Sequence, residues 1–258
     1  WNRHVVTGYK NLDKLNELIE HIADVRTSEE ALDLPERTFQ VIDVAPSPAL
    51  RKAYNRIATA EEVVELEGKI LPVENHLTKL GKLAQASSGF VYRSLEDPAI
   101  CDKCPHLEEC VRNEIKPYTS KCQVVTRSPG KEVINLTRGE AIIESCLELV
   151  SSHLENGKKV IVWAKHREML DSLYTSVSSS FGCEHVVRYD STTANPGEAE
   201  EAFNSDPNKR VIIAQITMGI GVTFKAPIMI YTELSFNLAD WLQSLDRNWG
   251  IRAKGLGN

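Results

Sequence analysis

Residues 158–173 read KKVIVWAKHREMLDSL, and residues 209–215 read KRVIIAQ. Each stretch contains a short apolar run rich in β-branched residues, which is typical of a strand buried on both faces. From Gly139 onward such runs alternate with helical patterns. Helices are expected at 140–155, 166–179, 196–204 and 238–248, and strands at 159–164, 185–189, 210–215 and 228–232. This alternation predicts an α/β fold in which helices cover a parallel sheet.

The region upstream of Gly139 has a different pattern. Its expected elements are an amphipathic helix at 10–24, a half-buried strand from Thr38 to Val44, a helix containing Tyr54, and a mainly helical stretch at 59–95 broken at Gly68, Pro72 and Gly89. Residues 96–131, rich in Pro, Cys and charge, indicate a small insertion. The α/β half is therefore expected to follow a mainly helical region with a Cys-rich insertion.

Composition limits the class of protein. The chain has 258 residues, 42% of them hydrophobic and 26% charged, which predicts a globular protein. No apolar run approaches the roughly 20 residues of a membrane-spanning helix, and no secretory signal is visible, so we expect no membrane association and a cytoplasmic location. The formal net charge of -6 is unusual for a nucleic-acid binder. Lys158, Lys159, Lys165 and Arg167 form a local basic group, either a binding strip or a solvated face.

Ligands of such sheets bind beyond the carboxyl ends of the strands, here the loops after residues 215 and 232. Gly219 and Gly221 in the first loop allow close approach of a phosphate or a nucleic-acid strand, although turn glycines are the commoner explanation. Gln243 and Arg247 are four residues apart and share one face of the last expected helix. An amide and a guanidinium pointing together suit a nucleotide phosphate, and an ordinary surface helix is the alternative.

The order of motifs resembles the SWI/SNF group of superfamily-two helicases. YKNLDKLNELI at 9–19, VRTSEEALDLPERT at 25–38 and VIDVAPSPALRKAY at 41–54 look like the exit from a first RecA-like lobe. HLTKLGKLAQASSGF at 76–90 resembles the helical segment before the second lobe. KKVIVWAKHREMLDSL then resembles helicase motif IV, AQITMGIGVTF at 214–224 motif V, and LADWLQSLDRNWGI at 238–251 motif VI.

This resemblance implies a motor that binds ATP between two RecA-like lobes and moves along double-stranded DNA. Residues 1–58 would end the first lobe and form the connection, residues 59–138 would be the helical region with its four-cysteine insertion, and residues 139–258 would be a truncated second lobe. The sequence contains no G-x-x-x-x-G-K-[ST] loop and no Asp-Glu pair. The Mg²⁺ ligands are therefore expected on an upstream lobe of the same protein, and the chain is expected to be a fragment at both ends.

The resemblance also assigns residue roles. It implies catalytic roles for Gln243 and Arg247, and it implies nucleotide or DNA contacts for Gly219, Gly221, Thr223, Asp246 and Arg252. Gly250 stands where the family has a second motif VI Arg, so either Arg252 supplies that charge or the arginine finger is lost. Motif V has Ala214-Gln215-Ile216 instead of the Ser-Thr-Arg run of chromatin remodellers, which is closer to bacterial or phage members.

Four cysteines, Cys101, Cys104, Cys110 and Cys122, lie in one short polar segment. Four thiolates are enough for a tetrahedral zinc site, which would supply folding free energy to a segment with few apolar residues. An iron–sulfur cluster uses the same ligands, and free thiols are the remaining alternative. His106 is a substitute ligand. Cys146 and Cys183 have apolar neighbours and are expected to be small core residues.

Two other classes of function compete with the motor. The chain is alternatively a non-catalytic nucleic-acid or protein-binding module on a degenerate motor lobe, which the missing motif VI Arg favours. A nucleotide-sugar transferase lobe has a similar α/β pattern but a different order of motifs. The sequence does not distinguish translocation along DNA from strand separation.

Overall fold

The structure is a computed structural model that describes residues 10–19, 22–23, 38–73, 75–94, 130–219 and 221–245. Among these residues, no helix is both long and apolar enough to cross a membrane. The predictions for Cys101 to Cys122, for Asp246, Arg247 and Arg252, and for the ends of the chain lie outside the described residues.

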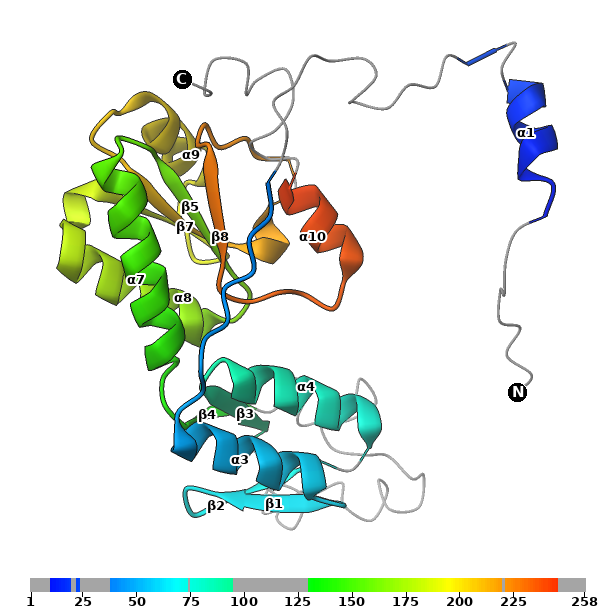
Figure 1. The fold of residues 1–258 in the computed structure, drawn as a ribbon, viewed down its shortest axis with the longest axis vertical. Coiled ribbons are helices and arrows are strands. Elements are labelled where there is room, and N and C mark those ends of the chain that lie inside the picture. The colour runs from blue at the N-terminus through cyan, green and yellow to red at the C-terminus, as the bar shows by residue number, and fades with distance from the viewer. Residues whose placement is uncertain are drawn as a thin grey trace, which may run out of the picture.

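A parallel sheet forms the centre of the downstream half (Figure 1). Its strands are β5 (Val160–Ala164), β6 (Val186–Tyr189), β7 (Val211–Gln215) and β8 (Ile228–Tyr231), in the order β6-β7-β5-β8. Val160 is in register with Val211 on one side and Ile228 on the other. All five residues of β5 are buried, because helices or loops cover both faces of this central strand.

Helices cover the two faces of the sheet and create two apolar cores. α7 (Glu140–Glu155) and α8 (Arg167–Phe181) pack on one face, where Val150 and Leu170 meet Val162. α9 (Pro196–Ser205) packs on the other face, where Phe203 and Phe224 meet Trp163. α10 (Leu238–Leu245) contacts the short 3-10 helix η2 (Ile216–Met218) that follows β7. The predicted α/β fold with a parallel sheet covered by helices is confirmed.

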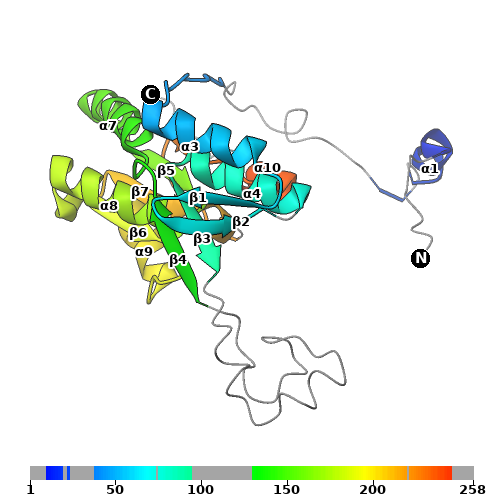
Figure 2. The same ribbon diagram turned by 90° about the horizontal axis from the view of Figure 1, so that it is seen from below.

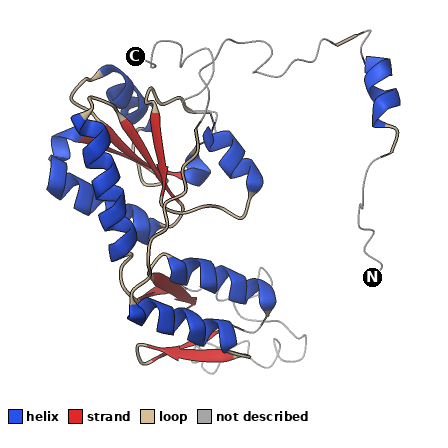
Figure 3. Cartoon of the chain, viewed as in Figure 1, coloured by secondary structure: helices blue, strands red, loops and turns tan. Residues whose placement is uncertain are grey.

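A small unit precedes this lobe (Figure 3), and a separate cluster of buried apolar residues forms its core. We define it as residues 48–73, 75–94 and 130–139. Its elements are α3 (Pro48–Thr59), β1 (Val63–Leu66), β2 (Lys69–Pro72), α4 (His76–Ser87), β3 (Phe90–Ser94) and β4 (Lys131–Asn135). Ile57, Leu71, Val91 and Ile134 pack together at its centre. β3 and β4 are antiparallel partners, so the segment at 95–129 connects two paired strands.

Three parts of the upstream region differ from the prediction. Residues 63–72 and 90–94, expected to be mainly helical, form the β1–β2 hairpin and strand β3. The hairpin forms because Glu67 and Gly68 both have positive φ and make a tight turn between β-branched stretches. The strand expected from Thr38 to Val44 is absent: the segment has no regular structure, no described strand pairs with it, and Val41 is 89% exposed. The α3 and α4 helices and the helical core of 10–24, α1 (Leu12–Ile19), are confirmed.

Two strands of the small unit come into close backbone contact just before the chain enters α7 of the lobe. The carbonyl of Gly89 accepts hydrogen bonds from the N–H groups of Leu136, Thr137 and Arg138. Gly89 has φ +89°, and a Cβ at this position would lie 2.2 Å from the backbone nitrogen of Gly139, at the start of α7. Figure 2, seen from below, shows the small unit lying across this end of the lobe. Only glycine permits this approach.

Candidate functional site

The loops at the carboxyl ends of β5 and β8 are held together by a buried carboxylate. Oε2 of Glu233, two residues after β8, accepts hydrogen bonds from the backbone N–H groups of Lys165 and His166, each at 2.8 Å. Its Oε1 lies 2.8 Å from Nδ1 of His166. The Glu233 side chain is only 3% exposed. Glu233 therefore fixes the start of α8 to the loop that leads into α10.

The same carboxylate connects the lobe to the small unit. Burial by itself would raise the pKa of Glu233, but hydrogen bonds and charge from His166 and a hydrogen bond from the Ser88 hydroxyl hold its pKa below the usual value. The His166 ring also packs against Phe90 and Tyr92 of β3, with centroid distances of 5.4 and 5.9 Å. Glu233 was not predicted as a site residue. The sequence did contain a signal for it, because Glu233 is an acidic residue just beyond an apolar strand, at the carboxyl edge of the sheet.

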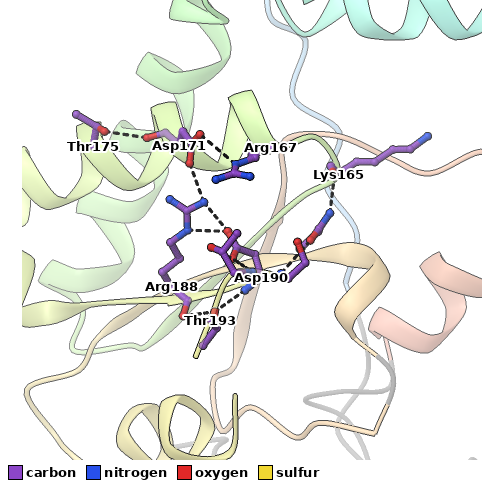
Figure 4. Close-up of polar contacts among 10 residues, drawn as sticks. Lys165, Arg167, Asp171, Thr175, Arg188, Asp190 and Thr193 are labelled. Carbon is purple, nitrogen blue, oxygen red and sulfur yellow. Dashed lines mark hydrogen bonds and ion pairs between the residues drawn. The ribbon is translucent and has the colours of Figure 1, made fainter. Parts of the chain in front are cut away.

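A second polar network ties β6 to β7 and α8 (Figure 4). Arg188 pairs with Asp171 of α8 at 2.7 Å and donates from Nε to Asp190 at 2.6 Å. Gln215, at the end of β7, accepts from the N–H of Ser191 and donates to the carbonyl of Lys165, both at 3.3 Å. The Lys165 side chain points away from this network. Gln215 thus links the loops after three strands, a role the sequence did not indicate.

The predicted basic group does not form one patch. Lys158 and Lys159 precede β5, whereas Lys165 and Arg167 follow it. Because Lys159 and Lys165 are six strand residues apart, the two pairs lie at opposite ends of the sheet, about 20 Å apart. Lys159 moreover donates to the backbone carbonyls of Phe203 and Asp206. The grouping in the sequence was misleading because a strand is an extended spacer.

The two glycines predicted to belong to motif V, Gly219 and Gly221, occupy their positions for different structural reasons. A Cβ on Gly219 would lie 3.2 Å from the carbonyl oxygen of Ile216 and 3.5 Å from the Trp163 ring, so the tight packing after η2 favours glycine there. Gly221 has φ +81° and open space around it, which is typical of a turn glycine. Thr223 is held by its backbone: its N–H donates to Glu200 at 2.9 Å, and its carbonyl accepts from Asn204 at 2.8 Å.

α10 positions Gln243 beside the motif V region. The Ser244 hydroxyl lies 2.8 Å from the Tyr231 hydroxyl at the end of β8, and Ser244 is fully buried. Asn237 caps the helix by accepting from the N–H of Ala239. Gln243 is half-buried on a helix that contacts η2, so the described residues predicted to form motif VI lie next to residues predicted to form motif V.

The two cysteines in the described residues have different environments. Cys146 is buried on α7, as predicted, and burial raises the pKa of its thiol to about 12. Cys183 is exposed beside Glu184, so the prediction of a core residue was wrong there. It follows a glycine with positive φ that turns the chain outward at the end of α8. No group of three or more potential metal ligands occurs among the described residues.

This site lies inside a recognised domain. The family described as "Helicase conserved C-terminal domain" matches residues 141–251, from the start of α7 to just beyond α10. These residues, fewer than half of the chain, are similar to the C-terminal domain of helicases, and the predicted resemblance to helicases is confirmed at this level. No curated protein matches the chain.

Several solved structures are similar to parts of the chain. The C-terminal part of the Fun30 ATPase domain is 24% identical with a TM-score of 0.37, over 42% of this chain and 35% of that one. The Sulfolobus solfataricus SWI2/SNF2 ATPase C-terminal domain is 14% identical with a TM-score of 0.40, over 78% and 82%. The DUF1998 helicase MrfA bound to DNA and AMPPNP is 17% identical with a TM-score of 0.34, over 41% and 16%. The matching region thus spans only about a third or less of the first two chains, Fun30 and MrfA.

Proposed function

We propose that this chain is the C-terminal motor portion of an ATP-dependent DNA translocase or helicase of the SWI/SNF type, acting in the cytoplasm. The observation that carries the proposal is the coincidence of the helicase domain match at 141–251 with the packing of α10 against η2. The segments predicted to be motif V and the start of motif VI contact each other through η2 and α10, and a shared nucleotide and DNA site would require this proximity. The order of motifs IV, V and VI along the chain supports the SWI/SNF type.

In this proposal motif VI contributes the catalytic residues. Gln243 would orient a phosphate oxygen or the attacking water, and Arg247, four residues further, would stabilise the charge that develops on the γ-phosphate. Asp246 and Arg252 would add nucleotide or DNA contacts. The motif V residues Gly219, Gly221 and Thr223 would line the path of the nucleic acid, and the open space around Gly221 would allow close backbone approach there.

ATP with Mg²⁺ fits the described residues only in part. The half-buried Gln243 amide suits a phosphate, but the described residues contain no cluster of acidic or other ligands that would hold the metal. As the family resemblance implies, we assign the phosphate loop and the Mg²⁺ ligands to a first RecA-like lobe, which would be the partner of this lobe across the nucleotide. ATP supplies the phosphoryl group, and this chain's contribution is orientation and charge.

Zinc at Cys101, Cys104, Cys110 and Cys122 is a further part of the proposal, supported by the spacing of the thiols. Native mass spectrometry should detect one metal per chain, and Cys104→Ser should abolish it, whereas Cys183→Ser should not. An iron–sulfur cluster would instead colour the protein brown. Metal-free protein with an unchanged protease digestion pattern in Cys104→Ser would contradict a metal site.

The decisive experiment measures DNA-stimulated ATP hydrolysis by the intact protein. Arg247→Ala should lower turnover by about 10³-fold or more and largely spare DNA binding, because an arginine finger acts on the transition state. Arg252→Ala should lower turnover less than Arg247→Ala. If Arg252 takes the role of the motif VI Arg that is replaced by Gly250, the two variants should lose turnover equally. Lys158→Ala, remote from the carboxyl edge, is the matched control.

Two results would refute parts of the proposal that this chain belongs to an ATP-dependent motor. Wild-type turnover in both Arg247→Ala and Arg252→Ala would mean that motif VI does not sense nucleotide, and the chain would then be a binding module. Robust DNA-stimulated hydrolysis by residues 1–258 alone would contradict the assignment of the phosphate loop to another lobe, since this sequence contains none.

A further inference from the structure

Positive charge is concentrated in the small unit. Its described residues include nine Lys or Arg and five Asp or Glu, whereas the described residues of the lobe, 140–219 and 221–245, include eight Lys or Arg and fourteen Asp or Glu. Among the described residues, a basic small unit is therefore joined to an acidic lobe, in a chain whose formal net charge is -6. A polyanion would be attracted to the first and repelled by the second.

Most cations of the small unit away from α3 are already engaged. Lys69 and Arg93 both pair with Glu132, at 2.7 and 3.6 Å. Lys79 donates to the carbonyl of Ala60, and Lys82 donates to the carbonyl of Tyr92. These groups stabilise the unit itself and have little capacity left for a ligand.

The three cations of α3 are different. Arg51, Lys52 and Arg56 are exposed, and within the described residues none of them has an ion pair or a side-chain hydrogen bond. The helix sequence, PALRKAYNRIAT, contains no acidic residue. Leu50 and Ile57 form its buried side, so at 100° per residue the three cations fall on the opposite, solvent-facing side. We call these three residues the α3 basic face.

The dimensions of this face suit a phosphate backbone. Arg56 follows Arg51 by five residues, a rise of about 7.5 Å along the helix. Double-stranded DNA carries about one charge per 1.7 Å of axis, so about four phosphates lie within that length. Apart from Tyr54, which is 38% exposed, α3 exposes no large apolar side chain that would drive protein–protein burial. Charge is therefore the dominant property of the surface.

The position of the small unit agrees with such a role. Phe90 and Tyr92 pack on His166 directly after β5, so the unit adjoins the carboxyl edge where Lys165 and Arg167 lie. α3 lies beside α4 in this unit (Figure 2). DNA engaged at that edge would have the small unit as its neighbour.

We propose that the α3 basic face is a duplex-DNA contact outside the helicase motifs, which holds the phosphate backbone by charge and without sequence preference. The proposal rests on the proposed function, since it presumes that DNA is the substrate of the motor. Its consequence is that part of the DNA affinity resides in the small unit, separate from nucleotide chemistry.

The test measures binding of a fluorescein-labelled DNA duplex to the intact protein by anisotropy, at salt concentrations from about 50 to 200 mM. The variant combines Arg51→Gln, Lys52→Gln and Arg56→Gln. The control combines Lys158→Gln, Lys209→Gln and Lys225→Gln, which removes the same charge from the lobe. Since each phosphate contact contributes about 0.9 to the salt slope, the α3 variant should lower the slope by about 2 to 3 and weaken binding about 10²-fold. The control should do neither, and turnover of the α3 variant at saturating DNA should match wild type.

Each failure has its own signature. An α3 variant that folds normally by circular dichroism and binds with the wild-type slope overturns the inference while leaving the motor intact. If the α3 variant loses self-association but keeps DNA binding, the α3 basic face contacts the acidic lobe of a second copy of the chain. That result would also overturn the inference. Wild-type protein that binds no duplex at any salt would refute the proposed function itself, and the inference with it.

Discussion

Removing the Glu233 carboxylate should destabilise the chain strongly. Glu233→Ala leaves the N–H groups of Lys165 and His166, and Nδ1 of His166, without their acceptor. A buried donor left unsatisfied costs about 1–3 kcal/mol, and water can reach part of the gap because the His166 side chain is 15% exposed. We therefore expect the free energy of unfolding to fall by about 3–5 kcal/mol. Glu233→Gln keeps an acceptor and the shape, and should cost only about 1–2 kcal/mol.

The pH dependence of this difference has a definite sign. The pKa of Glu233 is lowered in the folded chain from an ordinary value of 4.5, so its ionised form stabilises the fold above that value. This stability is lost as the pH falls through the folded-state pKa. The gap between wild type and Glu233→Gln should thus be constant above about pH 5 and should shrink below about pH 4.

Urea unfolding followed by far-ultraviolet circular dichroism and by tryptophan fluorescence measures both effects. Glu148→Gln removes an exposed carboxylate from α7 and should leave stability within about 0.5 kcal/mol of wild type. The reasoning is refuted if Glu233→Ala unfolds as wild type does, or if the gap to Glu233→Gln widens as the pH falls.

Further predictions concern the junction glycine and the thiols. Gly89→Ala should cost about 3 kcal/mol or more, because its Cβ would meet backbone at 2.2 Å, whereas Gly68→Ala, also at positive φ but in open space, should cost about 1 kcal/mol; equal thermal melts would contradict this. Iodoacetamide at about pH 8 should modify Cys183 in the folded chain and spare Cys146, whose pKa of about 12 keeps the thiol protonated. Peptide mapping measures the modification of each cysteine, and similar reaction rates for both would contradict this prediction.

The α/β half of the molecule could be predicted from local sequence patterns. Strands β5 to β8 and helices α7 to α9 lie within one or two residues of the predicted bounds, because a strand buried on both faces needs a continuous apolar run and a covering helix needs an apolar stripe. The start of α10 was likewise predicted. Each pattern is contained within its own element, so it can be recognised without knowing what the element packs against.

Contacts between distant residues could not be predicted in this way. Glu233 meets His166 across 67 positions, and no local pattern indicates that pairing. The hairpin at 63–72 formed where helix was expected, because two positive-φ residues and the packing of Leu71 outweighed propensity. Lys159 and Lys165 are only six positions apart in sequence, yet they lie at opposite ends of β5. Burial and charge depend on which segments meet, and the fold alone brings those segments together.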